Sequence, residues 1–118
     1  MQHHKRNRKL GREKGQRMAL LRSLARSLVL KDGITTTVAK AKELRPFIER
    51  LITTSKQNSL ASRRIVTTRM GGSTEIAKKL HEISAERFAK RAGGYTRIVR
   101  LGRVGKRVGE AARIEFVK

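Results

Sequence analysis

Residues 34–55 read ITTTVAKAKELRPFIERLITTS, and this stretch contains the most regular apolar pattern in the chain. Its first five residues are all β-branched, which favours a strand because such side chains fit a pleated surface. The apolar residues that follow recur at helical spacing and form a stripe about 100° wide. We therefore expect a strand over Ile34–Val38 that leads into the central helix of the core. The stripe consists of Ala41, Leu44, Ile48, Leu51, Ile52 and Ser55.

Pro46 lies in the middle of this helical pattern. A proline inside a helix loses one backbone hydrogen bond and bends the chain. On a helical wheel Pro46 is opposite Ile48, so its ring and the carbonyl of Lys42 would face water. We predict one continuous helix that curves around the core. The alternative is two shorter helices that meet at Arg45.

The composition favours a polyanionic partner. The chain has 118 residues, with 30 Lys and Arg against 9 Asp and Glu, and a net charge of +21. Such charge opposes compaction, and the phosphates of a nucleic acid would relieve the repulsion. The lack of cysteine excludes a disulfide-linked secreted mini-protein. Aromatic residues are too scarce for a single-strand binder that stacks bases, and with no tryptophan we expect no membrane partner.

The pattern of elements predicts two parts, a basic arm over residues 1–12 and a single domain over residues 13–118. The order helix, strand, helices, strand, strand predicts an α+β fold of two layers. We expect a mixed sheet of about three strands with several helices packed on it, the last two strands forming an antiparallel hairpin. The further elements predicted are helices over 13–30, 59–68 and 74–83, a last helical turn over 85–91 capped by Ser84, and strands over 95–101 and 111–117.

Helical spacing also predicts which side chains are buried. Met18 falls in the apolar half of the first helix, and Phe88 should point inward from the last helical turn. On the short helix that begins after Ser59, we expect Leu60, Ile65 and Val66 to form the buried side.

Basic residues are the candidate nucleic-acid contacts. The arm has a single leucine among its cations and cannot order itself by burial, so we expect it to order against phosphate; a solvated tail is the alternative. Arginines fall on both faces of the 95–101 strand, so one sheet face or a strand end should meet the anion. Tyr95 either stacks on a base or belongs to the core or sheet edge. The candidates are His3, His4, Lys5, Arg6, Arg8, Lys9, Arg12, Lys14, Arg17, Arg22, Lys40, Lys42, Arg63, Arg64, Tyr95, Arg97, Arg100, Arg103, Lys106 and Arg107.

The loop over residues 102–109 is rich in glycine and basic residues. It lacks the Gly-Lys-Ser/Thr ending of a nucleotide-binding P-loop, and suits contact with a phosphate backbone better. A DNA-binding architectural protein is the first alternative, although such proteins insert apolar wedges and this loop offers only Val104 and Val108.

An RNA-processing enzyme is the second alternative. No nucleophile–base set or carboxylate pair can be assembled from the scattered acids and histidines, so we expect no enzyme, no cofactor and no small-molecule substrate. His3 and His4 are adjacent, but His81 is far away and a zinc site needs four ligands, so we expect no metal.

Several blocks resemble the bacterial large-subunit ribosomal protein seventeen family across nearly the whole chain. They read KLGR (9–12), RMALLRSL (17–24), TTTVAKAKELRP (35–46) and GGYTRI (93–98). The resemblance implies a helix-and-sheet fold and a structural role in the large ribosomal subunit of the cytoplasm. It further implies binding to the large-subunit (23S) rRNA, neighbouring ribosomal proteins as partners, and a position on the solvent side near the exit of the peptide tunnel.

Overall fold

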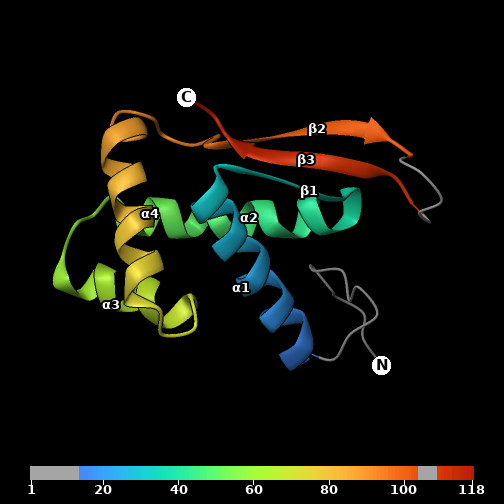
Figure 1. Ribbon diagram of the computed structural model, residues 1–118. Helices are drawn as coiled ribbons and strands as arrows, with labels where there is room; N and C mark the ends of the chain where they lie inside the picture. The colour runs from blue at the N-terminus through green and yellow to red at the C-terminus, as the bar shows by residue number, and fades with distance from the viewer. Residues whose placement is uncertain (1–13, 104–108) are drawn as a thin grey trace, which may run out of the picture.

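The computed structural model describes residues 14–103 and 109–118. Four helices and three strands occur within these ranges, in the predicted order (Figure 1). The predicted α+β class and its two layers are confirmed. The elements are α1 (Lys14–Lys31), β1 (Gly33–Thr37), α2 (Val38–Ser55), α3 (Leu60–Arg69), α4 (Thr74–Arg87), β2 (Thr96–Gly102) and β3 (Ala111–Phe116).

The sheet has the strand order β1-β3-β2, with β3 in the centre. Both pairings are antiparallel, so the described sheet is antiparallel throughout and the predicted mixed sheet is corrected. The reason is that the chain returns along β3 between two strands that run the other way. The predicted hairpin of the last two strands is confirmed, and the early strand β1 pairs with β3 to complete the sheet. In the register, Arg97 and Gly33 both lie opposite Glu115 on β3.

The helices pack against one face of the sheet, and the other face is free of helices (Figure 1). α2 runs along the covered face and contacts all three strands, while α1 and α4 pack against α2 and against each other. Leu28, Ile48, Leu80 and Ile114 come from four different elements and are fully buried in the same core. Burial of such side chains is the main stabilising term of the fold.

α2 is one continuous helix through Pro46, as predicted, and Pro46 is exposed while Ile48 is buried. The helix begins one residue earlier than expected. Thr37 is its N-cap, and its hydroxyl accepts a hydrogen bond from the backbone N–H of Lys40 at 3.3 Å. Val38 therefore opens the helix instead of closing the strand, because a threonine cap satisfies the free N–H groups of the first turn.

α3 begins after Ser59, as predicted, with a reciprocal capping box between Ser59 and Ser62. Its predicted buried side is only partly correct. Val66 is buried, but Leu60 and Ile65 are 66% and 45% exposed. The helix is short and packs against α2 and α4 through the side that carries Ser62 and Val66, so only one of the three apolar residues reaches the core.

α4 runs without a break to Arg87, so the predicted capped turn after Ile83 is wrong. The Ser84 hydroxyl donates to the carbonyl of Leu80 at 2.8 Å inside the helix, instead of capping a new turn. Phe88 ends the helix and is buried, as predicted. Met18 on α1 is 37% exposed, against the expectation that it lies in the buried half.

Candidate nucleic-acid interface

Part of the predicted interface lies outside the described residues. This part comprises His3, His4, Lys5, Arg6, Arg8, Lys9, Arg12, Lys106 and Arg107.

The described candidates are spread over the surface and do not converge on one site. Lys14 and Arg17 are in the first turn of α1, and Arg63 and Arg64 are on α3. A third group of candidates belongs to the start of α2 and the end of β2. The sheet end and the start of α2 are joined there, because the backbone N–H of Val38 donates to the carbonyl of Glu110 at 2.9 Å. Such a distribution suits an extended contact with a large polyanion. The third group consists of Lys40, Lys42, Arg100 and Arg103.

The two arginines of β2 face opposite sides of the sheet. Arg97 lies on the face without helices, opposite Glu115. Arg100 pairs with the buried Ala112, and its Nη1 is 3.6 Å from the carboxylate of Glu110. The uncovered face therefore presents Arg97, while Arg100 belongs to the end of the sheet.

A groove of about 620 Å³ borders the uncovered face, and we call it the sheet groove. Cations outnumber carboxylates along it, and one of the two carboxylates, Asp32, is paired with Arg87 at 2.7 Å. The groove is therefore electropositive. Its lining residues are Asp32, Arg91, Arg97, Arg113, Glu115, Phe116, Val117 and Lys118.

Glu115 is held by two arginines in this groove. The Arg97 guanidinium donates from Nε to Oε2 at 2.7 Å, and its Nη2 is 2.5 Å from the same oxygen. Arg113 Nε donates to Oε1 at 2.8 Å. The hydrogen bonds from Arg97 and then Arg113 hold the pKa of Glu115 below its ordinary value. The carboxylate is therefore ionised at neutral pH and fixes both guanidinium groups.

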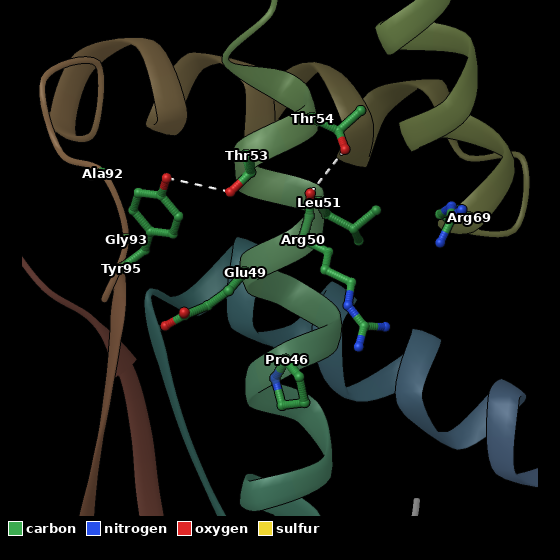
Figure 2. Close-up of a pocket in the computed structure, with 10 residues that line it drawn as sticks. All are labelled: Pro46, Glu49, Arg50, Leu51, Thr53, Thr54, Arg69, Ala92, Gly93 and Tyr95. Carbon is green, nitrogen blue, oxygen red and sulfur yellow. Dashed lines mark hydrogen bonds between the residues drawn. The ribbon is translucent and has the colours of Figure 1, made fainter. Parts of the chain in front are cut away.

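A second groove, of about 550 Å³, lies on the outer side of α2, and we call it the helix groove (Figure 2). Arg50 and Arg69 come to it from α2 and α3. The Nε of Arg22 on α1 donates to the carbonyl of Arg69 at 3.2 Å and so joins α1 to the end of α3. Two helices, α2 and α3, thus bring guanidinium groups to this groove. Its lining residues are Pro46, Glu49, Arg50, Leu51, Thr53, Thr54, Arg69, Ala92, Gly93 and Tyr95.

Tyr95 is only 1% exposed, and its ring packs 5.1 Å from the ring of Phe88. Thr53 and Lys56 each donate a hydrogen bond to its hydroxyl oxygen, at 3.3 Å and 3.2 Å. The hydrogen bond from Thr53 outweighs burial and lowers the pKa of Tyr95. A buried ring cannot stack on a base, so the interpretation of Tyr95 as a core residue is favoured and we remove it from the proposed contacts.

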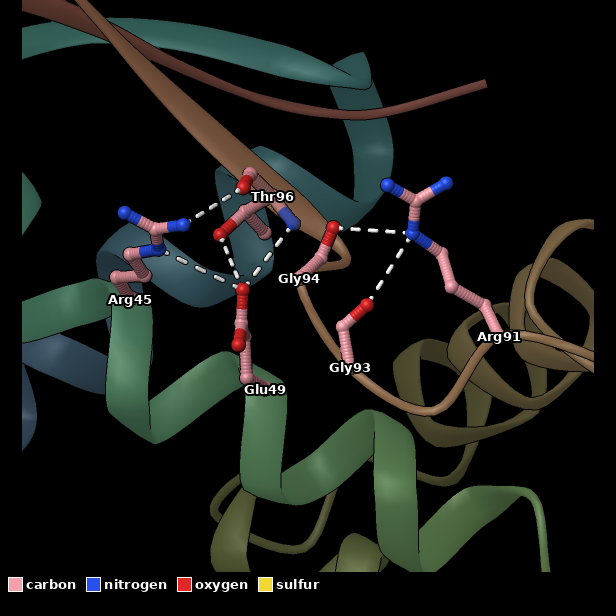
Figure 3. Close-up of polar contacts among 6 residues, drawn as sticks. All are labelled: Arg45, Glu49, Arg91, Gly93, Gly94 and Thr96. Atoms are coloured by element: carbon pink, nitrogen blue, oxygen red, sulfur yellow. Dashed lines mark hydrogen bonds and ion pairs between the residues drawn. The ribbon is translucent and has the colours of Figure 1, made fainter.

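The two sequence blocks around Pro46 and Tyr95 meet in space (Figure 3). The Glu49 carboxylate accepts hydrogen bonds from the hydroxyl of Thr96 at 2.9 Å and from its backbone N–H at 3.2 Å. Arg45 donates to the carbonyl of Thr96 at 3.3 Å and lies 3.6 Å from Glu49. This contact fixes the start of β2 against the middle of α2.

The segment from Arg91 to Tyr95 separates the two grooves, and cations hold its backbone. Arg91 Nε donates to the carbonyls of Gly93 and Gly94, each at 3.2 Å (Figure 3). Lys56 donates to the carbonyl of Arg91. The Nη atoms of Arg91 have no acceptor among the described residues. Their N–H donors are therefore free to bind a ligand from solvent.

Several groove residues were not among those predicted from the sequence. Arg113 and Glu115 are two apart on one strand, which places them on the same face, and this spacing was a usable signal. The pairing of Glu115 with Arg97 depended on the hairpin register, which no short motif specifies. The residues missed are Arg50, Arg69, Arg91, Arg113, Glu115 and Lys118.

Residues 14–103 and 109–118 offer neither a metal site nor a membrane-spanning helix. No three acidic or histidine side chains come together there to hold a metal ion. His81 lies beside Ser55, with its Nδ1 3.1 Å from the Ser55 carbonyl oxygen. None of the described helices has the length and apolar character needed to cross a membrane.

The fold and the two grooves define a small, strongly basic α+β domain with an extended cationic surface. The family described as Ribosomal protein L17 matches residues 20–117. A protein of Gemmatimonas aurantiaca is 47% identical over 117 residues, covering 99% of this chain and 98% of its own length. Proteins of Sphingopyxis alaskensis and Thermomicrobium roseum are 44% and 42% identical, each over 99% of this chain and over 84% and 99% of their own lengths.

All three relatives are named large ribosomal subunit protein bL17. This chain belongs to the ribosomal protein L17 family.

Proposed function

We propose that this chain is a structural, non-catalytic component of the large ribosomal subunit that binds its 23S rRNA. The observation that carries the proposal is membership of the family over nearly the whole chain, together with a net charge of +21. The two electropositive grooves on either side of the Arg91–Tyr95 segment support it.

The proposed mechanism is neutralisation of phosphates combined with shape matching. Arginine forks bind two phosphate oxygens at once and so fix geometry as well as charge. Arg50 and Arg69 present such forks in the helix groove, and Arg97 presents one in the sheet groove. RNA helices are recognised largely by their backbone and shape, so no base-reading motif is needed.

The remaining predicted contacts extend this surface. We propose that the 1–12 arm and the 102–109 loop reach between RNA helices, and that neighbouring large-subunit proteins contact the domain in the cytoplasmic ribosome. The alternative, a DNA-binding architectural protein, shares the charge but would need apolar wedges.

The test is binding of the purified chain to a full-length 23S rRNA transcript and to duplex DNA over a range of NaCl concentrations. We expect tighter binding to the rRNA, with the logarithm of the binding constant falling linearly as the logarithm of salt rises. A flat salt dependence would reject a phosphate-dominated interface. Equal or tighter binding to duplex DNA would favour the architectural protein.

A pair of variants locates the binding surface on the helix groove. Arg50→Gln with Arg69→Gln should weaken rRNA binding and reduce the salt slope by about 1 for each phosphate that the chain no longer neutralises. The matched control is Lys78→Gln with Lys79→Gln, which removes the same charge from exposed positions on α4 outside both grooves. Equal effects of the two pairs would show that the helix groove has no special part in binding.

A further inference from the structure

We propose that the uncovered face of the sheet binds RNA phosphates through Arg97 and Arg113, and that Glu115 is the positioning residue that holds both guanidinium groups in place. The inference rests on the proposed function and deepens it. It assigns a binding role to an acidic residue, although a carboxylate by itself repels the phosphates of RNA.

The first support is the placement of the three residues. Arg97 is directly opposite Glu115 across the β2–β3 pair, and Arg113 is two residues before Glu115 on β3. Side chains two apart on a strand share a face, and this face has no helix over it (Figure 1). The three charged groups therefore form one exposed row across two neighbouring strands.

The second support is the way in which the carboxylate uses the arginines. Each Glu115 oxygen takes one guanidinium: Oε1 accepts from Arg113 at 2.8 Å, and Oε2 from Arg97 at 2.7 Å. Arg113 uses only its Nε in this contact, and within the described ranges its Nη groups have no acceptor. The pair of arginines keeps a net positive charge and free N–H donors, which is what a phosphate oxygen requires.

The third support is Gly33, which lies opposite Glu115 on β1. A Cβ atom built on Gly33 would collide with Nη2 of Arg113 and would be 2.8 Å from its Cζ. The absence of a side chain at Gly33 is therefore what allows the Arg113 guanidinium to lie across the sheet. The site is thus shaped by all three strands.

The surroundings favour a chain of phosphates over an acidic protein surface. Arg91 and Lys118 line the same groove as the arginine pair, so four cations of the described residues share it. The other acid in the groove, Asp32, is neutralised by Arg87. Several cations in one groove suit the closely spaced phosphates of an RNA backbone better than the scattered carboxylates of a protein.

The central test is Glu115→Gln, because a charge-only interface and a positioning role predict opposite changes in rRNA affinity. If charge alone governs binding, removing an acid raises the net charge and should tighten binding to the 23S rRNA transcript. If Glu115 positions the arginines, binding should weaken, by about five- to tenfold for the loss of charge-assisted hydrogen bonds. The matched control is Glu75→Gln on exposed α4, which should leave binding unchanged or tighten it. Tighter binding by Glu115→Gln would overturn the inference.

Gly33→Ala provides a second test that changes no charge. The added methyl group should displace the flexible end of Arg113 and weaken rRNA binding, while circular dichroism and the unfolding midpoint show that the fold persists. Gly15→Ala is the control, because a Cβ there meets nothing within 4 Å and Gly15 lines neither groove. Unchanged binding by a folded Gly33→Ala variant would contradict the role given to Arg113.

A double-mutant cycle separates positioning from a merely structural role. In a chain that already carries Arg97→Gln and Arg113→Gln, the further change Glu115→Gln should no longer weaken rRNA binding, and should leave it unchanged or tighten it. An equal effect in both backgrounds would show that Glu115 acts independently of the arginines and would reject the proposal. The proposal would also be rejected if these variants bound the transcript normally but lost binding to poly-glutamate, because the uncovered sheet face would then suit an acidic protein. If the unchanged chain does not bind the transcript at all, the proposed function itself fails.

Discussion

At the scale of single residues, Glu49 and Thr96 hold together in the fold the two sequence blocks around Pro46 and Tyr95, which are distant in the sequence. The carboxylate of Glu49 accepts both the backbone N–H and the hydroxyl of Thr96, and Thr96 is buried at the first position of β2. Hydrogen bonds to a charged acceptor in a partly buried place contribute more than exposed ones. This contact anchors the strand that carries Arg97.

Thr96→Val removes the hydroxyl and keeps the shape of the side chain. We expect the free energy of unfolding to fall by about 1–2 kcal/mol, because the carboxylate keeps its bond from the backbone N–H but loses the second donor. Urea denaturation measures this loss. Thr35→Val, on an exposed β1 position, is the control and should change stability by less than about 0.5 kcal/mol. Equal losses in both variants would contradict the importance of the Glu49 contact.

Glu115 makes the stability of the chain depend on pH. Its folded-state pKa is lowered by hydrogen bonds from Arg97 and Arg113, so the native state favours the ionised form. This stabilisation is fully present above the unfolded pKa, about 4.5, and is lost as the pH falls through the lower native pKa. We expect the difference in unfolding midpoint between the unchanged chain and Glu115→Gln to shrink below pH 4.5. A difference that stays constant down to about pH 2 would show that the charge of Glu115 contributes nothing.

At the scale of elements, α3 is the helix most dependent on its cap. It is short, and only Ser62 and Val66 are buried along it, so its tertiary contacts are few. Its N-terminus is closed by the reciprocal bonds between Ser59 and Ser62, at 2.9 Å and 3.0 Å. Capping satisfies N–H groups that have no partner inside the helix.

Ser59→Ala should therefore lower the free energy of unfolding by about 1 kcal/mol. Thermal or urea unfolding followed by circular dichroism gives the value. Ser23→Ala, at an exposed mid-helix position of α1, is the comparison and should be neutral or slightly stabilising because alanine has the higher helix propensity. If Ser59→Ala is as harmless as Ser23→Ala, the capping box does not contribute to stability.

The sequence was sufficient for those elements whose local signals agree. The β-branched run predicted a strand, the apolar stripe predicted the buried side of α2, and Ser59 predicted the start of α3; all three are confirmed, with the strand ending one residue before its predicted end. The failures arose where two local signals compete. Ser84 can cap a new turn or bond back within a helix, and only packing of Phe88 and α4 on the core decides between them. Leu60 and Ile65 follow the helical spacing, but spacing does not say how wide a contact the neighbouring helices offer.

At the scale of the whole molecule, the dominant feature is the net charge of +21 on a small core. Self-repulsion among the cations opposes the compact state, and salt screens charges that are about 10 Å apart or more at about 0.1 M. With 30 Lys and Arg against 9 Asp and Glu, most cations cannot be neutralised within the chain, even though ion pairs such as Arg97–Glu115 and Arg87–Asp32 form.

We therefore expect the unfolding temperature of the free chain to rise when NaCl is increased from about 0.05 M to about 0.5 M, a range over which the screening length falls severalfold. Differential scanning fluorimetry or calorimetry measures this. Sulfate at the same ionic strength should raise it further, because a divalent anion bridges neighbouring arginines. A fall in the unfolding temperature with salt would show that ion pairs outweigh repulsion.

The candidate interface was predictable in kind but only partly in place. Charge and composition indicated a nucleic-acid surface, and the alternation in β2 placed Arg97 and Arg100 on different faces. The grooves required tertiary structure, because Arg50 and Arg69 are brought together by helix packing, and Glu115 meets Arg97 only through the hairpin register. Tyr95 was ambiguous because a strand pattern does not say which face is covered.

The most direct test of the central claim is where this protein sediments in cells. A lysate separated on a sucrose gradient at moderately high salt should show it with the large subunits and intact ribosomes, at about one copy for each large subunit. The same gradient on cells that produce only the Glu115→Gln variant shows whether a change in the sheet groove lowers the share of the protein that sediments with ribosomes. A protein that remains at the top of the gradient, or follows chromosomal DNA, would contradict the proposal that it is a structural component of the large ribosomal subunit.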